Sequence, residues 1–223
     1  MPAYFVTGSG TDVGKTFVAA ALLLALRAQG RDCAALKPVV SGFDPERPEG
    51  GDPAVLLEAL GRPVTPETLA AMSPWRFRAP LSPDRAARLE GRAIDFDALA
   101  RLCRRAAATA SGVLLIEGAG GVMVPLSDAR TTLDLMTALR LPLIFVAGSY
   151  LGAISHALTG LEAARSRGLA VRAVVVNEGA GASVGLEACA EAIGRFSSAP
   201  LALLRRQTLA DAAAALAALA RVI

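Results

Sequence analysis

The feature that most constrains the fold of this chain is a glycine-rich loop between two apolar segments. Tyr4–Thr7 predicts a β-strand, Thr16–Gln29 predicts a helix, and the residues between them read GSGTDVGK. A strand, a glycine loop and a helix in this order present backbone N–H groups and a helix N-terminus to a phosphate chain. The loop has one residue more than the common phosphate-loop pattern. We therefore predict a nucleoside triphosphate site, in which Lys15 reaches the β- and γ-phosphates and the hydroxyl of Thr16 coordinates Mg²⁺.

Strand-like and helix-like segments alternate along the rest of the chain. The strand-like segments are mostly unbroken apolar runs, as expected for strands that helices cover on both faces. Further strands are predicted at Cys33–Lys37, Val113–Glu117, Leu143–Ala147, Val171–Asn177 and Leu201–Leu204. Further helices are predicted at Pro53–Leu60, Phe96–Ala110, Thr132–Leu139, Ala153–Arg167, Val184–Phe196 and Leu209–Val222. The alternation indicates an α/β fold, a doubly wound, mainly parallel sheet with helices on both faces, similar to P-loop NTPases.

Two stretches rich in proline and glycine interrupt this alternation. Gly42–Pro53 and Ser73–Pro83 are predicted to be long loops. Loops of this length in a compact fold commonly carry function. No internal repeat or change of composition divides the 223 residues, so we expect one domain spanning residues 1–223.

Composition excludes several classes of protein. The net charge is only +3 and aromatic residues make up 4% of the chain, so no nucleic-acid partner is expected. One histidine and three widely spaced cysteines argue against a zinc site and a disulfide framework, and favour a reducing compartment. The longest apolar stretch, Phe17–Leu26, has 10 residues, whereas roughly 20 are needed to cross a bilayer. We expect a cytoplasmic protein that does not bind membranes.

Charged residues end two of the predicted strands. Glu117 ends one apolar run and is followed by GAGG, and Lys37 ends another. In a doubly wound sheet, the carboxyl ends of the strands meet at the edge where ligands bind. Glu117 is therefore predicted to bind Mg²⁺, and Lys37 to join Lys15 in stabilising the negative charge of phosphoryl transfer. Asp52 is predicted to be a second metal carboxylate or the N-cap of the helix that follows it, and the two roles can coexist.

A set of short motifs accompanies the phosphate loop. These are KPVVSG at 37–42, SP at 82–83, EGAGG at 117–121, PLSD at 125–128, LGAISH at 151–156 and VVN at 175–177. With these motifs, the segment from Tyr4 to about Asn177 resembles the dethiobiotin synthetase family. The extra residue in the phosphate loop is typical of that family, and so is the pairing of KPV-x-SG with EGAGG. The combination of the two features identifies the family more specifically than either feature alone.

The resemblance implies an ATP- and Mg²⁺-dependent ligase of biotin biosynthesis. Members of the family convert 7,8-diaminononanoate and CO₂ to dethiobiotin in the penultimate step of that pathway. The implied reaction proceeds through a carbamate and a carbamic–phosphoric mixed anhydride. This reaction needs no nucleophile from the protein. The protein has only to align the reactants and to neutralise the negative charge of phosphoryl transfer. The resemblance also implies a homodimer with its sites at the subunit interface.

The resemblance further implies a role for each matching residue. The expected catalytic residues are Lys15 and Lys37, and the expected Mg²⁺ ligands are Thr16, Asp52 and Glu117. The expected nucleotide-binding residues are Asp12, Val13, Gly14, Lys15, Thr16, Phe17, Asp52, Glu117, Gly118, Ala119, Gly120 and Asn177. Of these, Asn177 resembles the asparagine that reads adenine. The expected substrate-binding residues are Thr11, Lys37, Ser41, Leu151, Gly152, Ala153, Ile154 and Ser155. The last five resemble a helix N-terminus that holds the substrate carboxylate across the dimer interface.

Two departures from the family pattern concern the expected substrate pocket. Asp84 stands where the pattern has a histidine, and Ser155 stands where an asparagine is common. Three alternatives remain open beside the synthetase. A related amidoligase of cobalamin synthesis would carry a further glutamine-dependent domain. An ATPase switch of the partitioning or septum-site type has a second lysine at the start of its phosphate loop, where this chain has Gly8-Ser9-Gly10. A regulatory domain without catalysis is disfavoured by the joint presence of Lys15, Thr16, Lys37, Ser41, Asp52 and Glu117.

Overall fold

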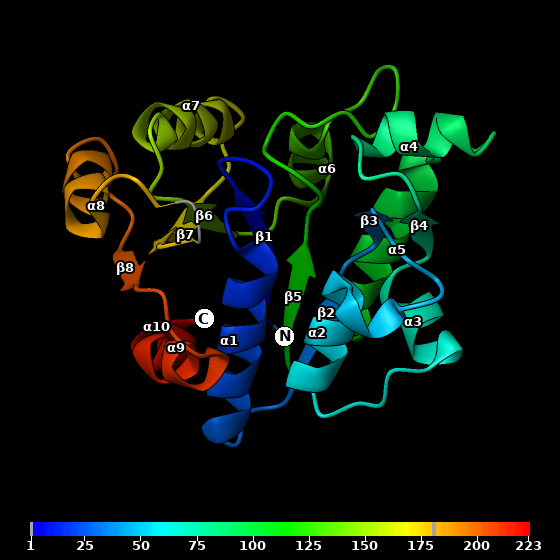
Figure 1. Cartoon of the computed structure of the whole chain (residues 1–223), viewed down its shortest axis with the longest axis horizontal. Helices are drawn as coiled ribbons and strands as arrows, with labels where there is room; N and C mark the ends of the chain where they lie inside the picture. Colours follow the sequence, from blue (N-terminus) through cyan, green and yellow to red (C-terminus); the bar gives the residue numbers. More distant parts are fainter. Residues whose placement is uncertain (1, 180–181) are drawn as a thin grey trace.

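A six-stranded sheet forms the centre of the fold in the computed structural model, which describes residues 2–179 and 182–223 (Figure 1). Its strands are β1 (Ala3–Gly8), β2 (Cys33–Leu36), β5 (Val113–Glu117), β6 (Leu143–Ala147), β7 (Val171–Asn177) and β8 (Leu201–Leu204). They lie in the order β2-β5-β1-β6-β7-β8, and every neighbouring pair is parallel. The predicted doubly wound parallel sheet is therefore confirmed, and β5 to β8 have the bounds predicted from the sequence.

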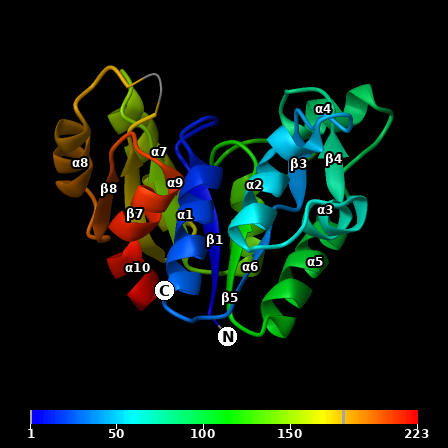
Figure 2. The same ribbon diagram turned by 60° about the horizontal axis from the view of Figure 1, so that its bottom comes forward.

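Helices cover both faces of this sheet, as Figure 2 shows. One face is covered by α1 (Lys15–Ala28), α2 (Asp52–Ala59), α3 (Pro66–Met72), α9 (Leu209–Ala215) and α10 (Ala217–Val222). The other face is covered by α5 (Phe96–Thr109), α6 (Thr132–Leu139), α7 (Ala153–Ser166) and α8 (Leu186–Gly194). Successive side chains of β1 enter opposite cores, because Tyr4 and Val6 pack on the α1 side and Phe5 packs on the other side. Both faces are therefore apolar, which explains the unbroken apolar runs.

The segment between β2 and α5 has more regular structure than the sequence predicted. It contains two short parallel strands, β3 (Val39–Ser41) and β4 (Trp75–Phe77), and also α4 (Pro83–Leu89) and a 3₁₀ turn, η1 (Pro48–Gly50). The prediction of loops at Gly42–Pro53 and Ser73–Pro83 is therefore wrong in part. Strands of three residues are too short to show a periodic pattern, and these two form only because distant parts of the chain meet.

Of the predicted helices, only Thr132–Leu139 has its predicted bounds; the others are shifted or shortened by one or two residues at one end or both, or are broken. The helix α2 begins at Asp52 rather than at Pro53. The helix predicted over Leu209–Val222 is broken at Leu216 into α9 and α10. The amide of Gln29 donates a hydrogen bond of 3.0 Å to the carbonyl of Ala217, so a contact with the end of α1 holds the second piece in place. Within the described ranges, no helix has the length and the apolar character that crossing a membrane requires.

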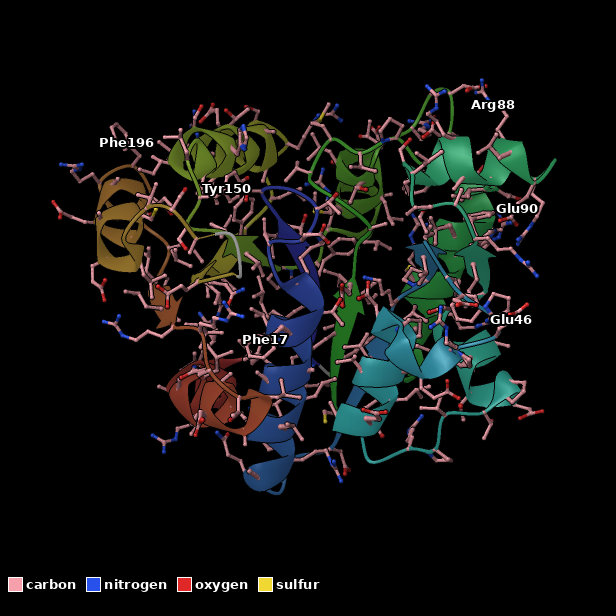
Figure 3. All side chains as sticks on the ribbon, viewed as in Figure 1. Phe17, Glu46, Arg88, Glu90, Tyr150 and Phe196 are labelled. Carbon is pink, nitrogen blue, oxygen red and sulfur yellow. The ribbon has the colours of Figure 1, made fainter. Side chains whose placement is uncertain are left out.

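Replacing Phe145 tests how much the core contributes to stability. Phe145 lies on β6 and is fully buried, so Phe145→Ala is expected to lower the free energy of unfolding by about 3–5 kcal/mol. The control is Phe196→Ala, because this ring is 76% exposed and lies at the periphery beside α8 (Figure 3). That change is expected to cost less than about 0.5 kcal/mol. Urea unfolding of both variants measures the difference, and equal losses would contradict the placement of Phe145 in the core.

Candidate functional site

The carboxyl ends of the central strands bring the predicted site residues to one edge of the sheet. Val6 of β1 pairs with Glu117 of β5, and Leu36 of β2 pairs with Ile116 of β5. The strand β5, which ends at Glu117, lies between β1 and β2. The phosphate loop therefore begins on one side of Glu117, and Lys37, which follows β2, lies on its other side. This is the edge at which parallel sheets of this kind bind ligands.

The loop between β1 and α1 has an unusual backbone. Gly14, the N-cap of α1, has a φ of 90°, a left-handed conformation that glycine adopts readily. Asp12 has a φ of 57°, which costs energy for a residue with a Cβ and is found most often at functional sites. The Nζ atom of Lys15 donates a hydrogen bond of 2.7 Å to the carbonyl of Gly10. The ammonium of Lys15 therefore lies over the loop.

The ammonium of Lys37 is the centre of a buried cluster of charges. It forms an ion pair with Glu117 and a second, of 2.7 Å, with Oδ2 of Asp52. The hydroxyl of Thr16 donates a hydrogen bond of 2.6 Å to Oε1 of Glu117. Lys37 is only 4% exposed and Glu117 only 1%, so each charge depends on the other for compensation. Residues from α1, α2, β5 and the end of β2 thus meet in one cluster.

These contacts fix the protonation of Lys37 and Asp52. Burial alone lowers the pKa of Lys37, but the carboxylates of Glu117 and Asp52 outweigh it and raise this pKa above its ordinary value. Burial acts to raise the pKa of Asp52, but the ammonium of Lys37 outweighs it and lowers this pKa below its usual range. Both groups are therefore charged at neutral pH.

The position of Asp52 corrects one of its two predicted roles. The N-cap of α2 is Gly51, and no side chain caps this helix. Asp52 is the first residue of α2 and its carboxylate binds Lys37 instead. The N-cap role is therefore wrong, whereas the carboxylate does lie at the expected edge of the sheet.

Lys15 has the opposite electrostatic environment. Burial first, and then the positive charge of Lys37, lower the pKa of Lys15 to about 8. The carboxylates of Glu117 and Asp52 oppose this decrease without cancelling it. Among the described residues no carboxylate forms an ion pair with Lys15, so this buried cation gains from any anion that enters the loop.

Oxygen atoms that suit Mg²⁺ gather beside the phosphate loop. Oε2 of Glu117 is buried and has no hydrogen-bond partner among the described residues. The hydroxyl of Thr16 and the carboxylate of Asp52 belong to the same cluster. Residues 2–179 and 182–223 contain no group of three or more His, Cys, Asp or Glu side chains that could hold a metal ion. The oxygen atoms of Thr16, Asp52 and Glu117 suit a cation such as Mg²⁺, which takes its remaining oxygen ligands from water and phosphate.

A cavity of about 790 Å³ opens at this edge of the sheet. The predicted site residues in its wall are Thr11, Asp12, Gly14, Lys15, Thr16, Lys37, Ser41, Asp52, Glu117, Ala119 and Gly120. The Oγ atom of Ser41 is buried without a hydrogen-bond partner in the described part of the chain, so it is available to a ligand. Residues of the phosphate loop, of the KPVVSG and EGAGG motifs and of the turn at Asp52 thus surround one space.

Apolar side chains that the sequence did not predict also line this cavity, among them Phe43 and Leu81. The guanidinium of Arg76 lies 5.3 Å from the centre of the Phe43 ring, and the N–H of Phe43 donates a hydrogen bond of 2.9 Å to the carbonyl of Phe77. Phe43 and Leu81 come from the two segments predicted as long loops. The presence of large apolar residues within loops rich in proline and glycine could have indicated that these loops form part of a binding site.

Four of the predicted nucleotide-binding residues do not line the cavity. Phe17 packs against the core on the α1 face of the sheet, at the position labelled in Figure 3. A Cβ atom at Gly118 would lie 2.8 Å from the ring of Phe5, so close packing accounts for that glycine. Val13 is a buried residue of the phosphate loop, and its carbonyl accepts a hydrogen bond of 3.0 Å from Nδ2 of Asn177, which is buried beneath the loop.

The predicted substrate segment at the start of α7 also lies outside the cavity. Leu151 is 85% exposed, Gly152 and Ser155 are exposed, Ile154 is partly buried and Ala153 is fully buried. Gly152 is the N-cap of α7, and in residues 2–179 and 182–223 no side chain caps this helix. The N–H groups of its first turn therefore lack a side-chain partner at the cap position.

Asp84 lines a separate, smaller cavity. This cavity has a volume of about 240 Å³ and is lined by Leu81, Asp84, Arg85, Arg88 and Leu89. Of these residues, Leu81 also lines the larger cavity. Asp84 and Lys37 therefore line two different cavities, which share Leu81 in their walls.

The chain resembles solved structures of one fold. A family model described as an AAA domain matches residues 2–211. The MinC:MinD cell division complex of Aquifex aeolicus has a TM-score of 0.60 at 12% identity, with 100% of this chain and 95% of that chain covered. MinD of Pyrococcus horikoshii, complexed with Mg-ADP, has a TM-score of 0.53 at 16% identity, with 96% and 94% covered. At such low identity these likenesses show the P-loop NTPase fold alone.

Curated relatives are far more similar in sequence. The ATP-dependent dethiobiotin synthetase of Phenylobacterium zucineum is 56% identical, over 81% of this chain and 77% of the relative. The same enzyme of Caulobacter vibrioides is 56% identical over 80% of both chains. That of Caulobacter sp. strain K31 is 50% identical, over 96% of this chain and 92% of the relative. The chain therefore belongs to the dethiobiotin synthetase family.

Proposed function

We propose that this protein is an ATP- and Mg²⁺-dependent ligase that converts 7,8-diaminononanoate and CO₂ to dethiobiotin, the penultimate step of biotin biosynthesis. The observation that carries the proposal is the placement of Lys15, Lys37 and Glu117 around one cavity, in a chain whose curated relatives are ATP-dependent dethiobiotin synthetases. It acts as a single domain of residues 1–223 in the cytoplasm. It needs neither nucleic acid nor a membrane.

ATP binds with its phosphates in the loop from Gly8 to Gly14. Lys15 leaves the carbonyl of Gly10 and pairs with the β- and γ-phosphates, which supply the counter-ion that it lacks. The nucleotide side of the cavity is formed by Asp12, Gly14, Lys15, Thr16, Asp52, Glu117, Ala119 and Gly120. Val13, Phe17, Gly118 and Asn177 support it from outside the cavity wall. Thr16, Asp52 and Glu117 hold Mg²⁺, which neutralises phosphate charge when it is bound.

The diamine binds in the same cavity, near Thr11, Lys37 and Ser41. One amine nitrogen attacks the carbon of CO₂ and loses a proton, which gives a carbamate. A carbamate oxygen then attacks the γ-phosphorus, the bond to the bridging oxygen breaks, and ADP leaves. The second amine attacks the carbamoyl carbon, loses a proton, expels phosphate and closes the cyclic urea. Lys37 and Lys15 neutralise the charge that builds up on the transferred group.

A homodimer completes the substrate site. The segment Leu151–Ser155 does not reach the cavity of its own chain, and Leu151 is 85% exposed. In the dimer, the uncapped N-terminus of α7 from one protomer binds the carboxylate of the substrate held by its partner. A helix N-terminus attracts a carboxylate through its N–H groups and its dipole.

A direct assay tests the proposed reaction. Purified protein incubated with ATP, Mg²⁺, bicarbonate and 7,8-diaminononanoate should form dethiobiotin, measured by mass spectrometry. Omission of any one component, or chelation of Mg²⁺, should abolish the product. Absence of dethiobiotin from the complete mixture, with ATP still bound, would reject the proposed substrate.

Replacing Lys37 tests its role in charge neutralisation. Lys37→Met is expected to lower kcat by about 10²–10³-fold, because one preorganised cation is lost, while ATP still binds through Lys15 and the loop. Arg165→Met is the control, because it removes an exposed cation whose partner is Glu162. Steady-state kinetics and ATP titration of folded variants measure both effects. If the kcat of Lys37→Met were close to that of the control, Lys37 would have no role in charge neutralisation during the reaction.

The pKa of Lys15 predicts how ATP binding depends on pH. With a pKa of about 8, Lys15 is mostly charged at neutral pH and loses its proton as the pH rises through this value. The affinity for ATP should therefore fall about tenfold between roughly pH 7.5 and pH 9. Lys15→Arg is the matched control, since arginine keeps its charge throughout this range. Calorimetric titration measures both profiles, and a parent profile as flat as that of Lys15→Arg would contradict the depressed pKa.

A further inference from the structure

Arg76 joins parts of the chain that meet only in the folded protein. It is the middle residue of β4 and is half-buried. Its Nη1 atom donates hydrogen bonds of 2.8 Å and 2.6 Å to the carbonyls of Leu69 and Ser73, at the carboxyl end of α3. Its guanidinium also lies 5.3 Å from the centre of the Phe43 ring, within the range of a cation–π contact. One side chain thus binds both the end of α3 and the residue that follows Gly42.

These contacts surround the strand β3, which pairs in parallel with β4 (Figure 1). Before β3, the N–H of Lys37 donates a hydrogen bond of 3.1 Å to the carbonyl of Met72, the last residue of α3. After β3, the N–H of Phe43 donates a hydrogen bond of 2.9 Å to the carbonyl of Phe77 on β4. Arg76 therefore binds the elements that hold β3 at both of its ends.

The segment that Arg76 supports forms part of the cavity wall. Lys37, Ser41 and Phe43 line the cavity, whereas Arg76 lies outside it. The hydroxyl of Ser41 is buried without a hydrogen-bond partner in the described part of the chain, so its place in the cavity depends on the backbone of β3. A displacement of β3 relative to β4 would therefore move Lys37 and Ser41 together.

The phosphate loop is anchored elsewhere. The N–H of Ser9 donates a hydrogen bond of 2.9 Å to the carbonyl of Val146 on β6, and Nδ2 of Asn177 on β7 bonds the carbonyl of Val13. The guanidinium of Arg76 bonds α3 instead. A change at Arg76 is therefore expected to disturb one part of the cavity and to leave the other in place.

We propose that Arg76 is a positioning residue for the diamine, which fixes the segment 37–43 and so places Lys37 and Ser41 without contacting any substrate. Its charge suits the carboxyl end of α3, where helix carbonyls gather, and its flat face packs on the ring of Phe43. This inference rests on the function proposed above.

The kinetics of two substitutions test this role. Arg76→Met is expected to lower kcat/KM for 7,8-diaminononanoate about 10–100-fold, because small displacements of aligning groups are costly. Arg76→Lys keeps a cation beside Phe43 and is expected to recover part of this loss. The affinity for ADP, titrated without Mg²⁺, should stay within about twofold of the parent value, because its phosphates bind in the loop.

Arg130→Met is the matched control. Its guanidinium also lies 5.3 Å from the centre of a phenylalanine ring, that of Phe96, but this ring belongs to α5. It should leave both quantities unchanged. A kcat/KM of Arg76→Met equal to that of the control would overturn the proposal. An equal loss of ADP affinity would overturn it as well, since the damage would then be general. If the parent protein forms no dethiobiotin, the proposed function fails, and the role in placing the diamine fails with it.

Trp75 reports the same effect without any substrate. It is the only tryptophan of the chain, it precedes Arg76 on β4, and its backbone N–H donates a hydrogen bond of 3.0 Å to the carbonyl of Pro38. Acrylamide should quench its fluorescence more strongly in Arg76→Met than in the parent protein or in Arg130→Met, because β4 is then less firmly attached to α3. Equal quenching in all three proteins would contradict the proposal.

Discussion

The ammonium of Lys37 links the stability of the fold to the geometry of the site. A cation that is only 4% exposed needs counter-ions, and the chain supplies Glu117 from β5 and Asp52 from α2. Loss of one partner from such a buried pair costs about 3–5 kcal/mol, because it leaves a charge without compensation. The placement of α2 beside the sheet is therefore tied to the charges that the site requires. The hydroxyl of Thr16 extends the cluster to the first turn of α1.

Most of the central sheet could be predicted because its signals are local. The strands β5 to β8 are short and mostly apolar, and their bounds follow from the sequence. The strands β3 and β4 could not be predicted, since Val39 pairs with Trp75 across a long insertion and each strand has only three residues. The helix α3 did have start signals, the capping box of Thr65 and Thr68 and a proline in its first turn. Seven residues are too few for a clear helical period.

The site was predictable where chemistry and strand ends coincide. Lys37 and Glu117 follow apolar runs, so their arrival at one edge follows from the parallel sheet. The partner of Asp52 was not predictable from the sequence. An aspartate that precedes a proline can serve as a helix N-cap, and it can equally well pair with a buried ammonium group. Only the approach of Lys37 decides between them. The wall formed by Phe43 likewise depends on Arg76 and Phe77, which lie far away in the sequence.

Lys15 and Lys37 show how neighbours give two identical side chains different tasks. Both are buried at the same edge, yet the pKa of Lys15 falls to about 8 and that of Lys37 rises above its ordinary value. Lys37 has its counter-ions within the protein, so its position is fixed before any ligand binds. Lys15 is opposed by the charge of Lys37 and rests on a carbonyl, so an incoming phosphate chain relieves the repulsion. In the proposed reaction, binding energy is thus gained at Lys15 while Lys37 stays oriented toward the reacting group.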